Sequence, residues 1–193
     1  MGFYPDIDQT KTNLCWAAAC ANALTYAGWN PVFGASGVAE LYTMFAGLFP
    51  QGVLDQTYWP LSAVRDLIKD RGIAADPLDI IKQRPPYDFP LIEPLIASGG
   101  CAILQMDLYY GSTYVNSHAL TAYDASYDNN FSSKDPRRVT RLTYVDSEDS
   151  AQAIYEMSVT YNPIQRIYLS DYHGPTTTGS RLPAWYSVSH IGR

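Results

Sequence analysis

The sequence predicts an α+β fold, in which an amino-terminal helical part packs on a mainly antiparallel β-sheet. Apolar residues recur at spacings of three and four before Gly99-Gly100, and short β-rich runs follow that pair. Helical segments followed by strands are typical of α+β proteins. At 193 residues the chain suits one domain, so we expect a single domain over 1–193, helical over 13–98 and sheet-rich over 100–193.

The central helix is expected over residues 14 to 26 or 27, in an alanine-rich segment. Thr12 or Asn13 can cap its start, and Gly28 can end it. A turn is predicted around residues 30–31, and further helices over 36–49, from 60 or 61 to 70, and over 91–97. The second of these helices has proline near its first turn and Gly72 as its expected end. Four prolines within 76–90 exclude a long regular element there. We read 52–59 as a connector.

Strands are predicted over 101–108, 118–126 and 139–145, with a further pair over 151–161 and 164–169. A Thr/Gly/Ser loop begins at Gly174, and a last strand starts at Trp185.

Composition excludes several function classes. The formal charge is −6 and no Lys/Arg run exceeds two residues, so we expect no nucleic-acid partner. No apolar run approaches the roughly 20 residues that span a bilayer. Residues 1–9 lack a signal-peptide pattern, so we expect a leaderless or already trimmed chain. Cys20 and Cys101 follow no zinc-type spacing and are expected to be small buried apolar residues.

Cys15 is the candidate nucleophile. It lies at the predicted first turn of the central helix, where unpaired N–H groups and the positive end of the helix dipole favour a thiolate. Gln9, six residues earlier, can donate its side-chain amide to an oxyanion, and the backbone N–H of Cys15 is the second expected donor.

A thiolate nucleophile needs a base, and His118 has the best context of the three histidines. It stands at the head of a predicted strand, Ser-His-Ala-Leu-Thr-Ala-Tyr, from which the imidazole would project at a sheet edge. His173 lies in a predicted loop, and His190 lies three residues from the end.

The base in turn needs an orienting group. Asp146 follows a predicted strand and is our choice. Glu148 would point to the same side if the extension continued. Asp149 is a third carboxylate of the same segment. An alternative interpretation of this segment is a solvated acidic turn with no catalytic role.

Gln9 lies six residues before Cys15, and Trp16-Ala17 follow Cys15 directly. This segment of the chain resembles the papain-like cysteine peptidases. That resemblance implies a papain-like fold with the cysteine on a central helix and the histidine on a later sheet. It implies Cys15, His118 and Asp146 as catalytic residues, Gln9 and Cys15 as the oxyanion hole, and Trp16 and Glu148 as supporting residues.

The segments Ser-His-Ala-Leu-Thr-Ala-Tyr and Leu-Thr-Tyr-Val-Asp-Ser-Glu-Asp resemble motifs of the streptococcal immunoglobulin-degrading cysteine peptidases. This narrower resemblance implies a secreted or host-delivered virulence factor that hydrolyses host proteins such as immunoglobulin. The chain departs from that family by carrying Trp16-Ala17 where the family has Gly-Ala, and by using Gln9 rather than a lysine for the oxyanion. The expected peptidase is a monomer that uses no metal or organic cofactor.

Three alternatives share these observations. One is a papain-like amidase or injected effector, acting on peptidoglycan or another host target through the same residues. Another is an inactive binding module. This alternative is disfavoured because every expected catalytic position carries a suitable residue. The last is a structural domain with an ordinary buried Cys15, whose thiol would be unreactive.

Overall fold

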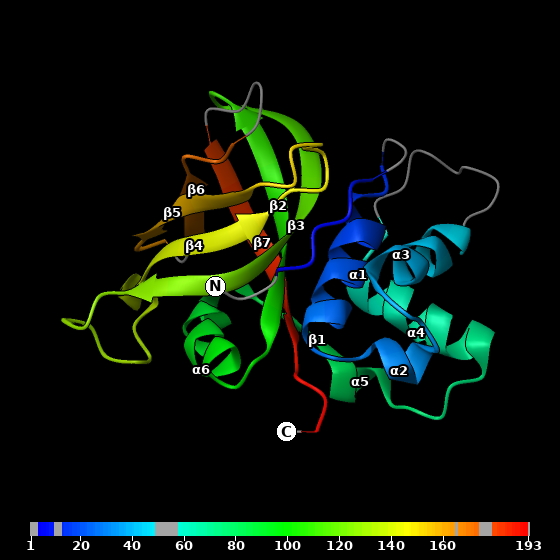
Figure 1. The fold of residues 1–193 in the computed structure, drawn as a ribbon. Coiled ribbons are helices and arrows are strands. Elements are labelled where there is room, and N and C mark those ends of the chain that lie inside the picture. The colour runs from blue at the N-terminus through cyan, green and yellow to red at the C-terminus, as the bar shows by residue number, and fades with distance from the viewer. Residues whose placement is uncertain (1–3, 10–12, 49–57, 165, 174–178, 193) are drawn as a thin grey trace.

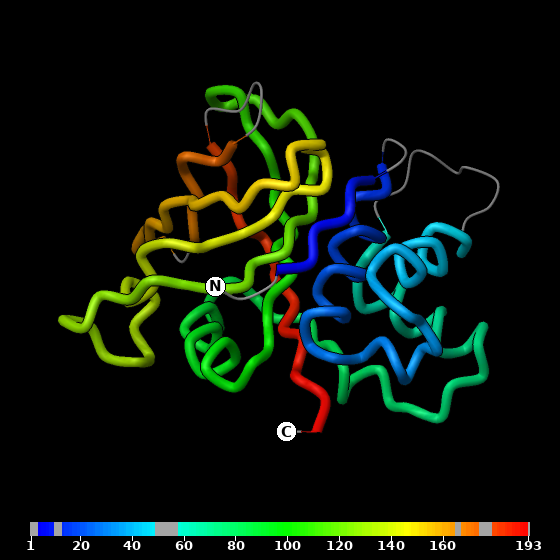
Figure 2. The backbone as a smooth tube through the Cα atoms, viewed as in Figure 1, coloured from blue at the N-terminus to red at the C-terminus, as the bar shows by residue number. Residues whose placement is uncertain are grey.

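The computed structural model describes residues 4–9, 13–48, 58–164, 166–173 and 179–192 of the chain. Helices of the first 80 residues form one side of the molecule, and a strongly curved β-sheet forms the other (Figure 1). A short extended arm, residues 4–9, runs between the two sides (Figure 2).

The central helix, α1 (Cys15–Tyr26), begins and ends where its sequence predicts. Gly28 follows it in the left-handed region at φ 85°, a conformation that glycine adopts at little cost. Its alanines are fully buried or nearly so, which lets neighbouring elements approach the backbone closely. The predicted cap was wrong: Leu14 is the N-cap and supplies no side-chain hydrogen bond, Asn13 has φ 70°, and Thr12 lies outside the described residues.

The other helices of this side are close to the predicted segments. A four-residue helix, α2 (Asn30–Phe33), occupies the expected turn, and α3 (Val38–Gly47) and α4 (Pro60–Arg71) follow. Gly72 ends α4 in the left-handed region, as predicted. The expected connector at 52–59 lies outside the described residues except for its last two positions, 58 and 59.

The proline-rich stretch holds only short elements, as expected, but one of them is a strand. These elements are α5 (Pro77–Ile80), β1 (Ile81–Arg84), the 3₁₀ helix η1 (Pro86–Leu91) and α6 (Ile92–Ala97). Strand β1 pairs with the last strand of the chain, so this part of the predicted helical half belongs to the sheet.

The remaining strands form an antiparallel sheet in the order β1-β7-β2-β3-β4-β5-β6, and β6 also pairs with β7. The extra pairing closes six strands into a barrel and leaves β1 outside it. The six are β2 (Cys101–Tyr110), β3 (Thr113–Tyr127), β4 (Val139–Val145), β5 (Ile154–Asn162), β6 (Arg166–Ser170) and β7 (Gly179–Val188). A 3₁₀ turn, η2 (Pro136–Arg138), precedes β4.

The expected papain-like fold, with a helical part packed on a mainly antiparallel sheet, was therefore wrong. The closed six-stranded barrel with one extra strand overturns it. The error arises at β7, which starts at Gly179 rather than at Trp185, and its first part supplies the pairs with β6 that close the barrel. Pro183 interrupts the pattern, yet it sits where the register between β7 and β2 shifts, and a bulge tolerates a residue without an N–H.

Two apolar cores lie on opposite faces of the barrel wall. Along β2, Ile103 faces the core shared with α1, α3 and α4, while Leu104 and Met106 face the barrel interior. Side chains alternate between the two faces of a strand, so a wall that is buried on both sides reads as a continuous apolar run. This is why residues 101–104 lack polar alternation.

Candidate functional site

Cys15 is the first residue of α1 and is half-buried. N–H groups in the first turn of a helix have no partner within that helix. The N-cap residue of α1, Leu14, supplies no side-chain hydrogen bond to these groups. The thiol is therefore attached to a backbone that can donate to an oxygen held beside it.

His118 lies in β3 with 2% of its surface exposed. Its Nε2 is 2.7 Å from Asp146 Oδ1, and the imidazole also forms a hydrogen bond with the Cys15 thiol. Because Asp146 occupies Nε2, the ring nitrogen that can face the thiol is Nδ1. The expected position at the head of a strand was wrong: five residues of β3 precede His118, and Met106 of β2 is its register partner.

The pKa values of His118 and Asp146 are shifted in opposite directions. Burial alone would lower the pKa of His118, but the hydrogen bonds to Asp146 and Cys15 outweigh it and raise the value to about 10. Burial likewise opposes ionisation of Asp146, whereas the hydrogen bond from His118 and its positive charge hold the pKa of Asp146 below its ordinary value. Both shifts favour an imidazolium beside a carboxylate.

Asp146 follows the last residue of β4 and is itself held by two donors. The Tyr172 hydroxyl donates to Oδ2 at 2.5 Å, and the Glu148 backbone N–H donates to Oδ1 at 3.0 Å. The sequence analysis missed Tyr172, which comes two residues after β6 ends. Only the knowledge that β6 lies beside β5 in a closed barrel could have indicated that this hydroxyl returns to Asp146.

Gln9 reaches the same place from the arm. Its backbone N–H donates to the Ser147 carbonyl at 2.9 Å, and its Nε2 donates to Glu148 Oε1 at 3.2 Å. That carboxylate oxygen is 4.0 Å from His118 Nδ1. A carboxamide has two N–H donors, so the bond to Glu148 fixes the Gln9 side chain and leaves its second donor for a substrate oxygen.

The remaining predicted site residue, Trp16, is buried against the ring of Tyr58, with centroids 5.0 Å apart in an edge-on arrangement. It packs the start of α1. Cys20 and Cys101 are free and fully buried, as predicted, and burial raises the pKa of both thiols.

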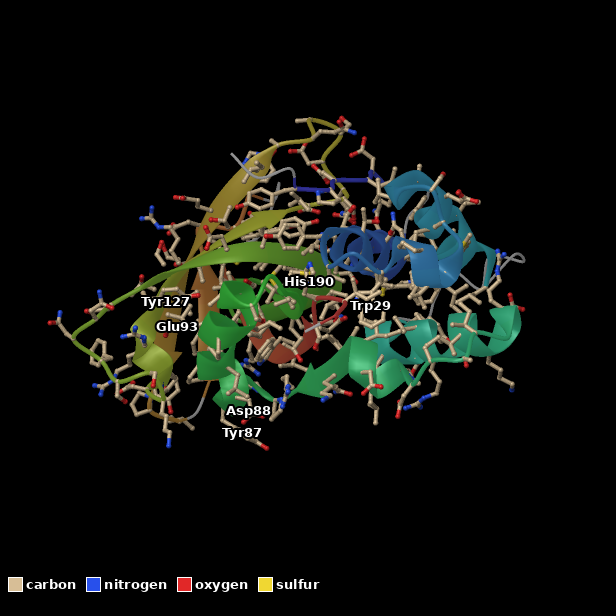
Figure 3. All side chains as sticks on the ribbon, turned by 60° about the horizontal axis from the view of Figure 1, so that its bottom comes forward. Trp29, Tyr87, Asp88, Glu93, Tyr127 and His190 are labelled. Atoms are coloured by element: carbon tan, nitrogen blue, oxygen red, sulfur yellow. The ribbon has the colours of Figure 1, made fainter. Side chains whose placement is uncertain are left out.

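The other two histidines lie elsewhere. His173 stacks on Tyr155 with ring centroids 4.3 Å apart. His190 lies near Trp29, where the carboxyl-terminal segment meets the helical side (Figure 3). Trp29 Nε1 donates to the Ser189 carbonyl, and the N–H of Ile191 bonds to Ala27 at the C-terminal end of α1. Cys15 is at the opposite end of that helix, so of the three histidines His118 is the one bonded to it.

No protein-family model matches this chain, and no curated protein matches it either. In the part of the chain that the structure describes, no group of three or more His, Cys, Asp or Glu side chains is arranged to hold a metal ion. No helix of that part is long and apolar enough to cross a membrane.

Proposed function

We propose that the chain is a cysteine endopeptidase. Cys15 is the nucleophile, His118 the general base and acid, and Asp146 the group that orients His118. Gln9 Nε2 and the backbone N–H of Cys15 form the oxyanion hole. The observation that carries the proposal is the buried imidazole of His118, which is bonded to a carboxylate and to a thiol at a helix N-terminus.

Each part of this arrangement has a chemical reason. A thiolate is a far stronger nucleophile than a thiol, and a paired imidazolium and a helix N-terminus both stabilise it. A carboxylate on the far nitrogen fixes the tautomer of the imidazole and stabilises the imidazolium. The amide and backbone donors stabilise the negative charge that develops on the attacked carbonyl oxygen.

The proposed reaction has two stages. The thiol proton passes to His118, and the sulfur attacks the peptide carbonyl to form a tetrahedral oxyanion. His118 then donates its proton to the leaving amine as the C–N bond breaks, which leaves a thioester on Cys15. His118 next takes a proton from water, whose oxygen attacks the thioester. As the C–S bond breaks, His118 returns this proton to the sulfur, which releases the acid and restores the thiol.

The proposed substrate is a protein, and the motif resemblance makes immunoglobulin the first one to test. The assay incubates the chain with immunoglobulin G, with an unfolded protein mixture and with purified peptidoglycan, and identifies new termini by mass spectrometry. New peptide termini that are absent with Cys15→Ala support the proposal. Release of peptidoglycan fragments alone, or no cleavage of any substrate, would overturn it in favour of an amidase or an inactive module.

A further inference from the structure

The arm that delivers Gln9 is fastened to the rest of the molecule by a few polar contacts. The Tyr123 hydroxyl donates to the Pro5 carbonyl at 2.5 Å, and the Ile7 N–H donates to Asn22 Oδ1 of α1 at 3.0 Å. At its start, Tyr4 stacks on Tyr123 with ring centroids 4.9 Å apart. In Figure 2 the arm passes between the barrel and the helical side. Gln9 can act only where these contacts place it.

Asp6 lies in the middle of this arm, and its carboxylate is buried without a hydrogen bond that would offset the cost of burial. Both of its oxygens are buried, and neither has a hydrogen-bond donor among the described residues. Two further carboxylate oxygens are also buried without a hydrogen-bond donor among the described residues: Asp8 Oδ1 of the same arm and Asp149 Oδ2 of the loop after β4. A buried charge without a partner is costly, so this arrangement favours a neutral carboxyl.

Among the described residues, the groups that face Asp6 give it no positive charge. Asp8 lies on its own arm, and Asp146 and Asp149 lie on the loop after β4, and all three oppose its ionisation. On β3 it faces Tyr123, whose pKa the Asp6 charge raises in turn. On α1 the arm meets the uncharged Asn22.

We infer that Asp6 is a positioning residue for Gln9. While Asp6 carries a proton, the arm stays docked and holds Gln9 in the site. When Asp6 ionises, the arm detaches and Gln9 leaves the site. The inference rests on the proposed function for its catalytic consequence. The docking of the arm is a property that can be measured without any activity.

The direction of the effect follows from the pKa of Asp6. Burial, followed by the charges of Asp8, Asp146 and Asp149, raises it from 3.8 to about 7 in the docked arm. In a released arm the pKa of Asp6 has its ordinary value of 3.8. Between pH 3.8 and about 7 the docked arm therefore binds more protons than the released arm. Docking therefore weakens as pH rises through this window, by at most about tenfold per pH unit, and stays weak above it.

The test measures hydrogen exchange of the Ile7 and Gln9 amides in Cys15→Ala protein at pH 5 and pH 8, expressed as protection factors corrected for intrinsic exchange. We expect protection to fall by roughly ten- to a hundredfold between these pH values in the parent and less than twofold with Asp6→Asn. Asp149→Asn should give an intermediate fall, because it removes one of the repelling charges. Asp79→Asn, an exposed aspartate of α5, makes the same charge change elsewhere and should behave as the parent.

Amides of α1, followed in the same experiment, report that each variant is folded. Equal pH dependence in the parent and in Asp6→Asn, or no dependence in the parent, would overturn the inference. If the chain cleaves a protein substrate, kcat/KM of Asp6→Asn relative to wild type should be near one at pH 5 and rise several-fold at pH 8. Absence of cleavage would overturn the proposed function alone, because the exchange data decide the docking.

Discussion

His118 Nε2 and Asp146 Oδ1 are 2.7 Å apart, and each of the two residues has only 2% of its surface exposed. A hydrogen bond between an ionised pair in such a place is short and strong, and it fixes one ring orientation. The other ring nitrogen is thereby left to the Cys15 thiol. The predictions below depend on this relationship.

Asp146→Ala should reduce kcat by roughly 10²- to 10⁴-fold, because the imidazole loses the carboxylate that fixes its tautomer. Glu148→Ala removes an exposed carboxylate 4.0 Å from Nδ1 and should cost less than about tenfold. Steady-state kinetics on one peptide substrate compare the two variants. A larger loss for Glu148→Ala would make Glu148 the orienting group.

Tyr172→Phe should lower kcat by about ten- to a hundredfold with little change in KM, since it removes only the hydroxyl that holds Asp146 Oδ2. The matched control is Tyr155→Phe, which keeps the ring that stacks on His173. Loss of the Tyr172 hydrogen bond should also raise the pKa of Asp146, so the acidic limb of the pH–rate profile should move upward. Equal kinetics in the two variants would show that Tyr172 has no part in positioning Asp146.

Gln9→Ala should lower kcat by roughly 10²- to 10³-fold, the usual effect of losing one oxyanion donor. Because the donor acts mainly in the transition state, KM should change little. A loss confined to KM would instead assign Gln9 to ground-state substrate binding.

In Cys15→Ala, which has no thiol to ionise beside His118, the free energy of unfolding should fall as pH rises from 6.5 to 8.5. In this variant the hydrogen bond to Asp146 and its negative charge still raise the pKa of His118 above its unfolded value of 6.5, so the folded state binds more protons across this interval. The stabilisation is complete below pH 6.5 and is lost as pH rises toward the raised pKa of His118. Urea denaturation of Cys15→Ala should show a loss of about 1 to 2 kcal/mol that is absent when His118→Gln is added, and identical slopes in the two proteins would contradict the raised pKa.

Local patterns predicted most of the elements. Alanine spacing with a closing glycine located α1, proline with Gly72 located α4, and apolar runs located β2 and β4. Closure of the barrel depended on the first residues of β7, from Gly179 onward, which precede the strand start predicted at Trp185. Strand register and bulges arise from long-range pairing, which the short-range pattern does not contain.

The candidate site likewise contains residues that the sequence predicted and residues that only the fold reveals. Cys15, His118, Asp146 and Gln9 were expected to converge from residue type and spacing, and the structure brings them together. Tyr172 and Asp6 were missed, because their importance comes from what surrounds them in the fold. A tyrosine after a strand and an aspartate in an arm have no distinguishing sequence signal.

The most direct test is the pH dependence of iodoacetamide alkylation at the three cysteines, with each adduct located by peptide mass spectrometry. Cys20 and Cys101 are internal controls because they are fully buried and burial raises their pKa. The account predicts selective labelling of Cys15 at pH 5 to 6, lost in His118→Ala. Labelling of Cys15 only above about pH 8, as for a free thiol, or equally in His118→Ala, would contradict a thiolate–imidazolium pair and with it the proposed peptidase.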